Sequence, residues 1–407
     1  MTDRKSGRPV SRRRLLTGGA LAASGALAGA AAATVATTSD RPTAAVASDT
    51  GTAVEPFHGT RQSGVATIPQ AHASFVAFTL QAGTDRAVLG RMLRLLSDDA
   101  ARLAQGLPAL ADTEAELAVL PARLSVTFGF GPGLYRMVGL ESRRPPSVAD
   151  LPAFAVDRLQ PAWSGGDLLL QICADDPVTV AHAQRMLIKD SRPFATVRWV
   201  QQGFRRGHGV QQGNPTQRNL FGQLDGTANP QPGTPALDTA VWITDEAPWL
   251  RDGSTLVLRR IRMDLERWDL LGRADRELAV GRRLDTGAPL TGQAEHDPPD
   301  FAAVNEAGLT VIPDFSHLSR AHVTDDRQRI LRRPYNYDGV PAADGTADSG
   351  LIFASYQADI TAQFLPIQRR LAERDLLNEW TTPVGSAVFA IPPGCPPGGW
   401  IGQQLLG

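Results

Sequence analysis

The chain has 407 residues, of which 42% are hydrophobic, and its formal net charge at pH 7 is −1. This length and apolar content are typical of a globular protein with one large domain or two domains of ordinary size. No stretch beyond the N-terminal segment is long and apolar enough to predict a membrane span. Beyond the N-terminal segment the chain has no basic run, which argues against a nucleic acid or an anionic membrane as a partner.

The first 47 residues are predicted to be a targeting segment. The sequence Ser11-Arg12-Arg13-Arg14-Leu15-Leu16 resembles the twin-arginine export signal, and a weakly apolar Ala/Gly/Leu-rich stretch follows it from Thr17 to about Ala36. Ala45-Val46-Ala47 is a candidate cleavage site, and cleavage nearer Ala36 is the alternative. This segment carries seven basic and two acidic residues, which leaves a net charge of −6 for the remainder. We therefore expect an acidic protein exported to the periplasm, the cell wall or the medium.

Residues 48–215 are predicted to form an N-terminal domain. Continuous or alternating apolar stretches predict strands, and apolar residues at helical spacing predict helices. The strands are expected at 73–80, 123–130, 168–173 and 196–200, and the helices at 85–106 and 178–190. This strand-helix-strand-strand-helix-strand order is the ferredoxin-like pattern of an α+β fold, in which helices pack on an antiparallel sheet.

Residues 216–407 are predicted to repeat this order as a C-terminal ferredoxin-like domain. Strands are expected at 255–263, 351–356 and 388–391, and helical segments at 265–271, 277–281 and 364–371. The repeat rests on the order of elements, since the two halves show no sequence self-similarity. Between Thr286 and Tyr337 the chain is rich in Pro, Gly and Asp with little periodicity. Irregular segments of this length in a compact domain are usually functional or disordered, and its candidate ligand favours function here.

One acidic residue, Asp225, lies in the glycine-flanked sequence Gly222-Gln223-Leu224-Asp225-Gly226, which the turn-forming pair Asn229-Pro230 follows. Glycine has no side chain, so it lets the backbone approach a flat ligand closely and adopt dihedral angles that other residues avoid. Such a loop either places the carboxylate for chemistry or uses it to cap the turn, as in many Asp-Gly turns. Two later sequences favour chemistry: Ile312-Pro313-Asp314-Phe315-Ser316-His317 and the stretch Ile330–Tyr337.

Together these sequences resemble the dye-decolourising peroxidases, in particular the exported branch related to bacterial deferrochelatases. The family hallmark is a Gly-x-x-Asp-Gly loop, which Gly222–Gly226 matches. The further matching segments are 57–64, 165–176, 350–357 and 383–389. The resemblance implies a haem-dependent peroxidase that reduces hydrogen peroxide and oxidises small or bulky, phenolic or dye-like reductants through a ferryl intermediate. The alternative, which needs the same pocket, is haem or iron handling in an iron- or copper-linked export system.

The resemblance also implies a cofactor and its ligand. One haem b per chain is expected in the second half, and neither cysteine has the spacing of a covalent haem attachment. The axial iron ligand is expected to be His317, with His322 as its rival. Phe221, Gly222 and Gly226 of the glycine loop are expected to lie against the haem.

Catalytic and supporting roles follow from the same resemblance. Asp225 is the expected acid–base group on the opposite face of the haem. Arg332 is expected to contact the cofactor and to stabilise negative charge as the O–O bond breaks. Its neighbour Arg333 is expected to be a surface or structural residue. Glu379 is the expected acceptor for the second ring nitrogen of His317, with Asp375 as the alternative.

The chain has two cysteines. Cys173 lies in the apolar run 168–173 and is expected in the core, whereas Cys395 lies in a Pro/Gly-rich loop. A disulfide between them is left open, because an exported protein meets an oxidising environment. A homodimer is also left open, since ferredoxin-like halves expose sheet and helix surfaces that often pair.

Overall fold

The computed structural model describes residues 50–211, 216–244, 247–341 and 345–407. The predicted targeting segment, residues 1–47, lies outside the described residues. So does residue 215, where the predicted boundary between the two domains falls, and both interpretations stay predictions. Residues 48–407 form one compact unit.

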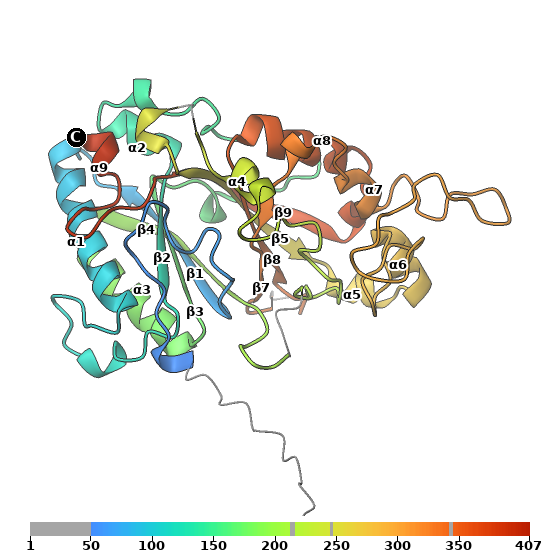
Figure 1. Ribbon diagram of the computed structural model, residues 1–407, viewed down its shortest axis with the longest axis horizontal. Helices are drawn as coiled ribbons and strands as arrows, with labels where there is room; N and C mark the ends of the chain where they lie inside the picture. Colours follow the sequence, from blue (N-terminus) through green and yellow to red (C-terminus); the bar gives the residue numbers. More distant parts are fainter. Residues whose placement is uncertain (1–49, 212–215, 245–246, 342–344) are drawn as a thin grey trace, which may run out of the picture. The chain divides into compact units, whose positions relative to one another are not determined.

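The first half of this unit is a four-stranded antiparallel sheet. Its strands are β1 (His72–Leu80), β2 (Ser125–Phe130), β3 (Leu168–Ala174) and β4 (Ala195–Phe204), in the order β4-β1-β3-β2. The helices α1 (Arg86–Ala104) and α3 (Pro177–Ser191) lie on its outer face (Figure 1). The side chains of Asp85 and Asp176 cap these helices by accepting the backbone N–H of the third helical residue, so the helices begin where the apolar periodicity begins.

The second half repeats the same strand order. Its strands are β5 (Ser254–Met263), β7 (Tyr335–Asp338), β8 (Ser349–Gln357) and β9 (Thr381–Ile391), in the order β9-β5-β8-β7. In each half the first strand lies between the third and the fourth, which confirms the prediction of two ferredoxin-like halves. A short strand, β6 (Leu331–Arg332), pairs with β8 next to β7.

The two sheets meet at both of their edges. Phe130 of β2 pairs with Ala390 of β9, and Phe204 of β4 pairs with Asn336 of β7. The strands therefore follow one another around a closed ring, because β5 and β8 also pair. Aromatic side chains fill its interior, among them Phe75, Trp199, Tyr335, Tyr356 and Phe389.

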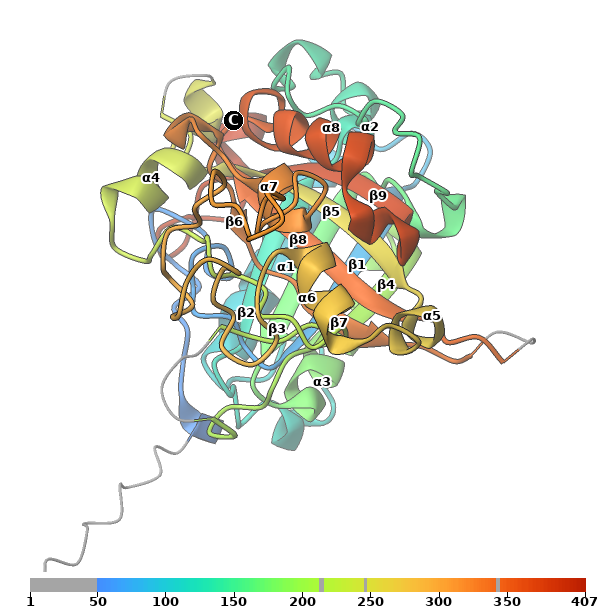
Figure 2. The same cartoon turned by 90° about the vertical axis from the view of Figure 1, so that its right-hand side faces the viewer.

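The helices of the second half are short. Four of them, α5 (Leu265–Asp269), α6 (Arg273–Val280), α7 (His317–Ala321) and α8 (Leu365–Arg374), lie in front of the second sheet in Figure 2. A small apolar cluster fixes α5 and α6 to the sheet through Trp268, Ala279 and Leu351. The remaining helices are α2 (Pro132–Met137), α4 (Pro235–Val241) and α9 (Gln403–Leu406).

Three further sequence predictions have an outcome in this fold. Cys173 and Cys395 are both free and buried, so they form no disulfide. Arg333 is a structural residue: it is buried, and its guanidinium donates hydrogen bonds to the Thr67 carbonyl and the Gln70 side chain. Within the described ranges, none of the helices has the length and apolar character needed to cross a bilayer.

Candidate functional site

His317 is the first residue of α7, a five-residue helix that Ser316 caps. Its Nδ1 lies 2.6 Å from Oδ2 of Asp375, the residue directly after α8. The other carboxylate oxygen of Asp375 accepts the backbone N–H of Leu377, so the carboxylate is fixed from two sides. Because a carboxylate accepts a hydrogen bond from Nδ1–H, the imidazole Nε2 is left as the atom with a free lone pair. It has no protein hydrogen-bond partner within the described part of the chain.

Asp225 lies in a loop whose backbone needs glycine. Gly222 and Gly226 have φ values of +78° and +136°, which side-chain-bearing residues rarely adopt. The loop turns back on itself through the bridge between Arg218 and Leu224, and the Asp225 N–H donates to the Gln217 carbonyl at 2.8 Å. The backbone of Asp225 is thus held independently of its side chain.

The carboxylate of Asp225 pairs with Arg332. Arg332 Nη1 lies 2.8 Å from Asp225 Oδ1, and the two side chains are 23% and 10% exposed. Asn229 fixes the arginine backbone, because its amide donates to the Arg332 carbonyl at 2.7 Å and accepts the Arg332 N–H at 3.0 Å. Asn229 therefore docks the end of the glycine loop onto β6.

The His317–Asp375 pair and the Asp225–Arg332 pair belong to one site. Burial lowers the pKa of His317, but the charge and hydrogen bond of Asp375 outweigh it and raise the pKa above its ordinary value. The charge of Arg332 opposes this rise and the charge of Asp225 assists it. The charges of both Asp225 and Arg332 thus influence the pKa of the His317 imidazole, which indicates that the two pairs lie near one another.

The prediction that Glu379 accepts from His317 is wrong. Its side chain is 63% exposed and faces Arg267 at 3.9 Å. The alternative, Asp375, has this position because the Leu376 N–H bonds to the Phe315 carbonyl and so brings residue 375 beside α7. Glu379 ends the next 3₁₀ turn, on its outer side.

The other predicted site residues have distinct surroundings. His322, the rival ligand, is exposed and packs on Phe301 with a ring separation of 4.8 Å. Phe221 is buried and stacks on Trp268 at 4.3 Å, and Trp268 in turn contacts the partly exposed Trp380 at 5.4 Å. Phe221 therefore anchors the glycine loop to the apolar cluster under α5.

Sequence reasoning missed two residues that build the site. Asn229 looked like an ordinary turn residue before Pro230, and Arg218 was given no role. Arg218 donates to the carbonyls of Gly222, Leu284 and Asp285, which joins the glycine loop to the segment after α6. No local sequence signal marks either role, since each depends on a contact with a distant segment.

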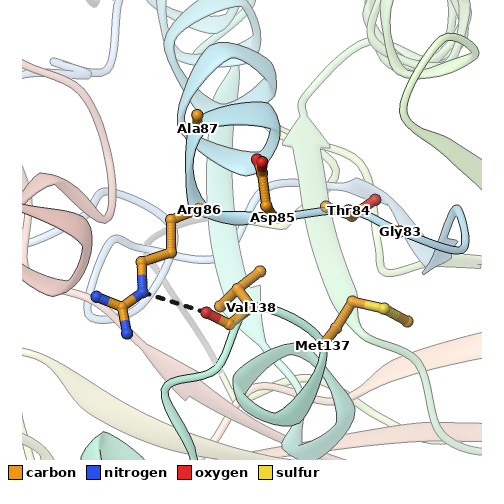
Figure 3. Close-up of a pocket in the computed structure, with 7 residues that line it drawn as sticks. All are labelled: Gly83, Thr84, Asp85, Arg86, Ala87, Met137 and Val138. Carbon is orange, nitrogen blue, oxygen red and sulfur yellow. Dashed lines mark hydrogen bonds between the residues drawn. The ribbon is translucent and has the colours of Figure 1, made fainter.

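A cavity of about 580 Å³ lies elsewhere, at the start of α1. Figure 3 shows its lining, in which Arg86 donates to the Val138 carbonyl at 3.2 Å. Asp85 there caps α1 through the Val88 N–H. This cavity contains none of the residues of the His317 site.

Comparison with known proteins identifies the family. Residues 62–205 match the N-terminal and residues 216–396 the C-terminal model of Dyp-type peroxidases, so the chain belongs to the Dyp-type peroxidase family. As a member of it, the protein is a peroxidase, an oxidoreductase that uses peroxide.

Individual relatives agree with this assignment. A dye-decolorizing peroxidase of Thermobifida fusca is 41% identical over 322 residues, which cover 77% of this chain and 75% of that protein. A deferrochelatase of Yersinia pestis is 34% identical over 415 residues, covering 97% and 95%. The crystal structure of a DyP-type peroxidase from Cellulomonas bogoriensis superposes with a TM-score of 0.85 at 50% identity, covering 88% of this chain and 99% of that one.

Proposed function

We propose that this protein is a haem-dependent peroxidase whose haem is bound non-covalently, with His317 as the axial ligand. The observation that carries the proposal is the His317–Asp375 hydrogen bond of 2.6 Å. It fixes the imidazole tautomer, makes the ring more basic and leaves Nε2 as the atom that would bind a metal, which is the usual arrangement of a ligating histidine. A single imidazole beside a carboxylate–guanidinium pair is a donor set that suits haem iron with one protein ligand.

Haem supplies the redox chemistry that splits peroxide and accepts electrons from a reductant. The chain supplies proton transfer and charge. Asp225 takes the proton from the peroxide oxygen that approaches the cofactor and returns it to the departing oxygen. Arg332, permanently protonated, orients the Asp225 carboxylate and stabilises the negative charge on the departing oxygen. Gly222 and Gly226 supply the positive φ angles that the loop around Asp225 requires, and the stacking of Phe221 on Trp268 holds the loop on its apolar side.

The test is the haem content of two histidine variants. His317→Ala should lose the haem or hold it weakly, because no other imidazole lies beside Asp375. His322→Ala is the matched control, five residues further on, and should keep the haem. The ratio of Soret absorbance to protein absorbance measures the content. A normal Soret band in His317→Ala contradicts the proposal.

A second candidate function is removal of iron from haem. A deferrochelatase matches nearly the whole chain, 97% of it, and such chemistry needs the same pocket. Anaerobic incubation of the haem-loaded protein with a reductant separates the two. Free protoporphyrin, detected by fluorescence, favours iron handling, whereas intact haem together with rapid peroxide-dependent oxidation of phenols or dyes favours the peroxidase.

We also propose export by the twin-arginine pathway, on the basis of Arg12 and Arg13. Replacing both with Lys should retain the precursor in the cytoplasm, as cell fractionation measures. Unchanged export of this variant contradicts the route. A homodimer of the exported protein stays a prediction that sedimentation velocity tests directly.

A further inference from the structure

Glu295 accepts hydrogen bonds from two residues of the loop that carries Asp225. Its Oε1 lies 2.6 Å from the Thr216 hydroxyl and 2.8 Å from the Thr227 hydroxyl. Thr216 is nine positions before Asp225 and Thr227 is two positions after it. A single carboxylate oxygen therefore joins the two ends of the segment 216–227.

Glu295 is itself held in place. Arg282 donates from one guanidinium nitrogen to the Glu295 carbonyl at 2.9 Å and to the Gly287 carbonyl at 2.7 Å. Burial lowers the pKa of Arg282, and the negative charge of Glu295 opposes that effect. The Glu295 side chain is 21% exposed. Arg282 thus holds the backbone of Glu295, and the hydroxyls of Thr216 and Thr227 hold its largely buried carboxylate.

The irregular segment that follows α6 also contacts the loop at a second place. Arg218 Nη1 donates to the carbonyls of Gly222 at 2.7 Å and Leu284 at 2.5 Å. Among the described contacts, the segment 282–295 therefore holds the loop at two places. One contact is made through Arg218 and the other through Glu295. A catalytic group held in this way is preorganised, and a displacement of about 1 Å can cost about 100-fold in rate.

We infer that Glu295 is a positioning residue for Asp225: it holds Thr216 and Thr227 together and so fixes the carboxylate between them against Arg332. An ionised acceptor suits this task, because hydrogen bonds to a charged group are roughly twice as strong as neutral ones. The inference rests on the proposed function, since it takes Asp225 to be the acid–base group. It also assigns a role to the long segment between α6 and α7, which is to hold the loop around Asp225 in place.

The test compares Glu295→Ala and Glu295→Gln with Glu306→Ala, a matched control with an exposed acid on the same segment. Stopped-flow absorbance of the haem-loaded protein measures the rate of the spectral change on mixing with peroxide. Hydrogen exchange of peptides that cover 216–227 measures directly how firmly the loop is held. Glu295→Ala should react roughly 10- to 100-fold more slowly and exchange faster in this segment. Glu295→Gln should recover part of both losses, because its amide oxygen accepts the same hydroxyls, and Glu306→Ala should match the parent.

The same substitution made in the Asp225→Asn variant shows whether Glu295 acts through Asp225. Adding Glu295→Ala to Asp225→Asn should slow the reaction little further, because the group that it positions is already lost. An equal further loss in that background overturns the inference, as does a parent rate in Glu295→Ala alone. If Glu295→Ala fails to fold, Thr227→Val removes one of the two hydroxyls and should show the same effects more weakly; a parent rate and parent exchange there also overturn it.

The two proposals fail in different ways. If Asp225→Asn is slow while Glu295→Ala is not, only the positioning role is overturned. If Asp225→Asn reacts at the parent rate, the acid–base role of Asp225 is overturned, and with it the role of Glu295.

Discussion

In the first half of the molecule, long helices connect the strands: α1 has 19 residues and α3 has 15. In the second half, α5, α6 and α7 have only five to eight residues and are separated by irregular segments, and only α8, which directly continues the π-helix Ile360–Phe364, forms a longer helical stretch. The sheets have the same strand order in both halves. Every residue of the proposed site lies in the second half, on the glycine loop, on α7, on β6 or at the end of α8.

The difference concerns what each connection buries. Helix α1 buries a stripe of apolar side chains that includes Leu89, Leu93 and Leu96. Helix α7 buries no residue fully, and it presents His317 toward a carboxylate instead. The strand order of a sheet can thus stay the same while a connection loses buried apolar side chains and gains positioned polar groups. This is possible because the paired strands form a rigid scaffold. Five substitutions test how far this division holds.

The largest effects should come from replacing Asp225 or Arg332, the ion pair of the second half. Arg332→Leu removes a preorganised charge and should slow the reaction with peroxide by about 10²–10³. Asp225→Ala removes the acid–base group and should slow it by about 10²–10⁴. Neither is a ligand, so both should keep their haem. Stopped-flow absorbance measures the rates, with Arg327→Leu, an exposed arginine nearby, as control. Parent rates in both variants with full haem would show that the pair has no catalytic role.

A core substitution in the first half should have the opposite character. Leu93→Ala truncates a fully buried side chain of α1, which should cost about 2–5 kcal/mol of unfolding free energy. Because α1 lies outside the site, the rate of reaction with peroxide should not change at a temperature where the variant is folded. Chemical denaturation measures the first quantity and stopped-flow absorbance the second. A large change in rate would show that the packing of the first half affects the reaction in the second half.

The support of the axial ligand should have a smaller effect. Asp375→Asn keeps the shape but loses the charge that makes the imidazole basic, and should weaken haem binding or activity by about 10- to 100-fold. Glu379→Gln, the matched control, should leave haem binding unchanged because its carboxylate is exposed. Haem transfer to apomyoglobin measures the loss. Equal losses in the two variants would contradict the assignment of Asp375.

The fourth effect depends on pH and concerns a buried acid of the first half. Burial, reinforced by the nearby Asp190, raises the pKa of Asp99 to about 7, although a hydrogen bond from the Leu110 N–H opposes the rise. The folded state therefore holds a proton that the unfolded state releases above its ordinary pKa of 3.8. Stability should fall as pH rises from about 4 to about 7, by at most about 1.4 kcal/mol per pH unit, and then level off.

Asp99→Asn removes this titration. Its midpoint of unfolding should decline less than that of the parent between pH 5 and pH 8, and it should be the more stable protein at pH 8. Asp98→Asn, an exposed neighbour, should behave nearly as the parent does. Parallel stability curves for Asp99→Asn and the parent would exclude a titration of Asp99 in this range.

The regular elements could be predicted from the sequence because their signals are local. The strands and long helices of the first half agree with the apolar patterns, with shifts of one or two residues at most ends. β4 is longer than expected, since its outer positions are exposed and break the apolar run. β7 was not predicted, because Tyr335–Asp338 is short and follows Pro334, and only its pairing with β8 makes it a strand.

The amino-acid sequence by itself determined the two ferredoxin-like halves and the glycine loop around Asp225, which follow from apolar spacing and from a motif of a few residues. His317 is predicted as the ligand from the family resemblance, and that role stays a prediction. Tertiary structure alone decided that Asp375 and not Glu379 meets His317, that Asn229 docks the loop onto Arg332, and that Glu295 joins Thr216 to Thr227. These contacts join residues 58 to 103 positions apart. Their partners are set by how irregular segments fold over the sheet, which no short stretch of sequence encodes.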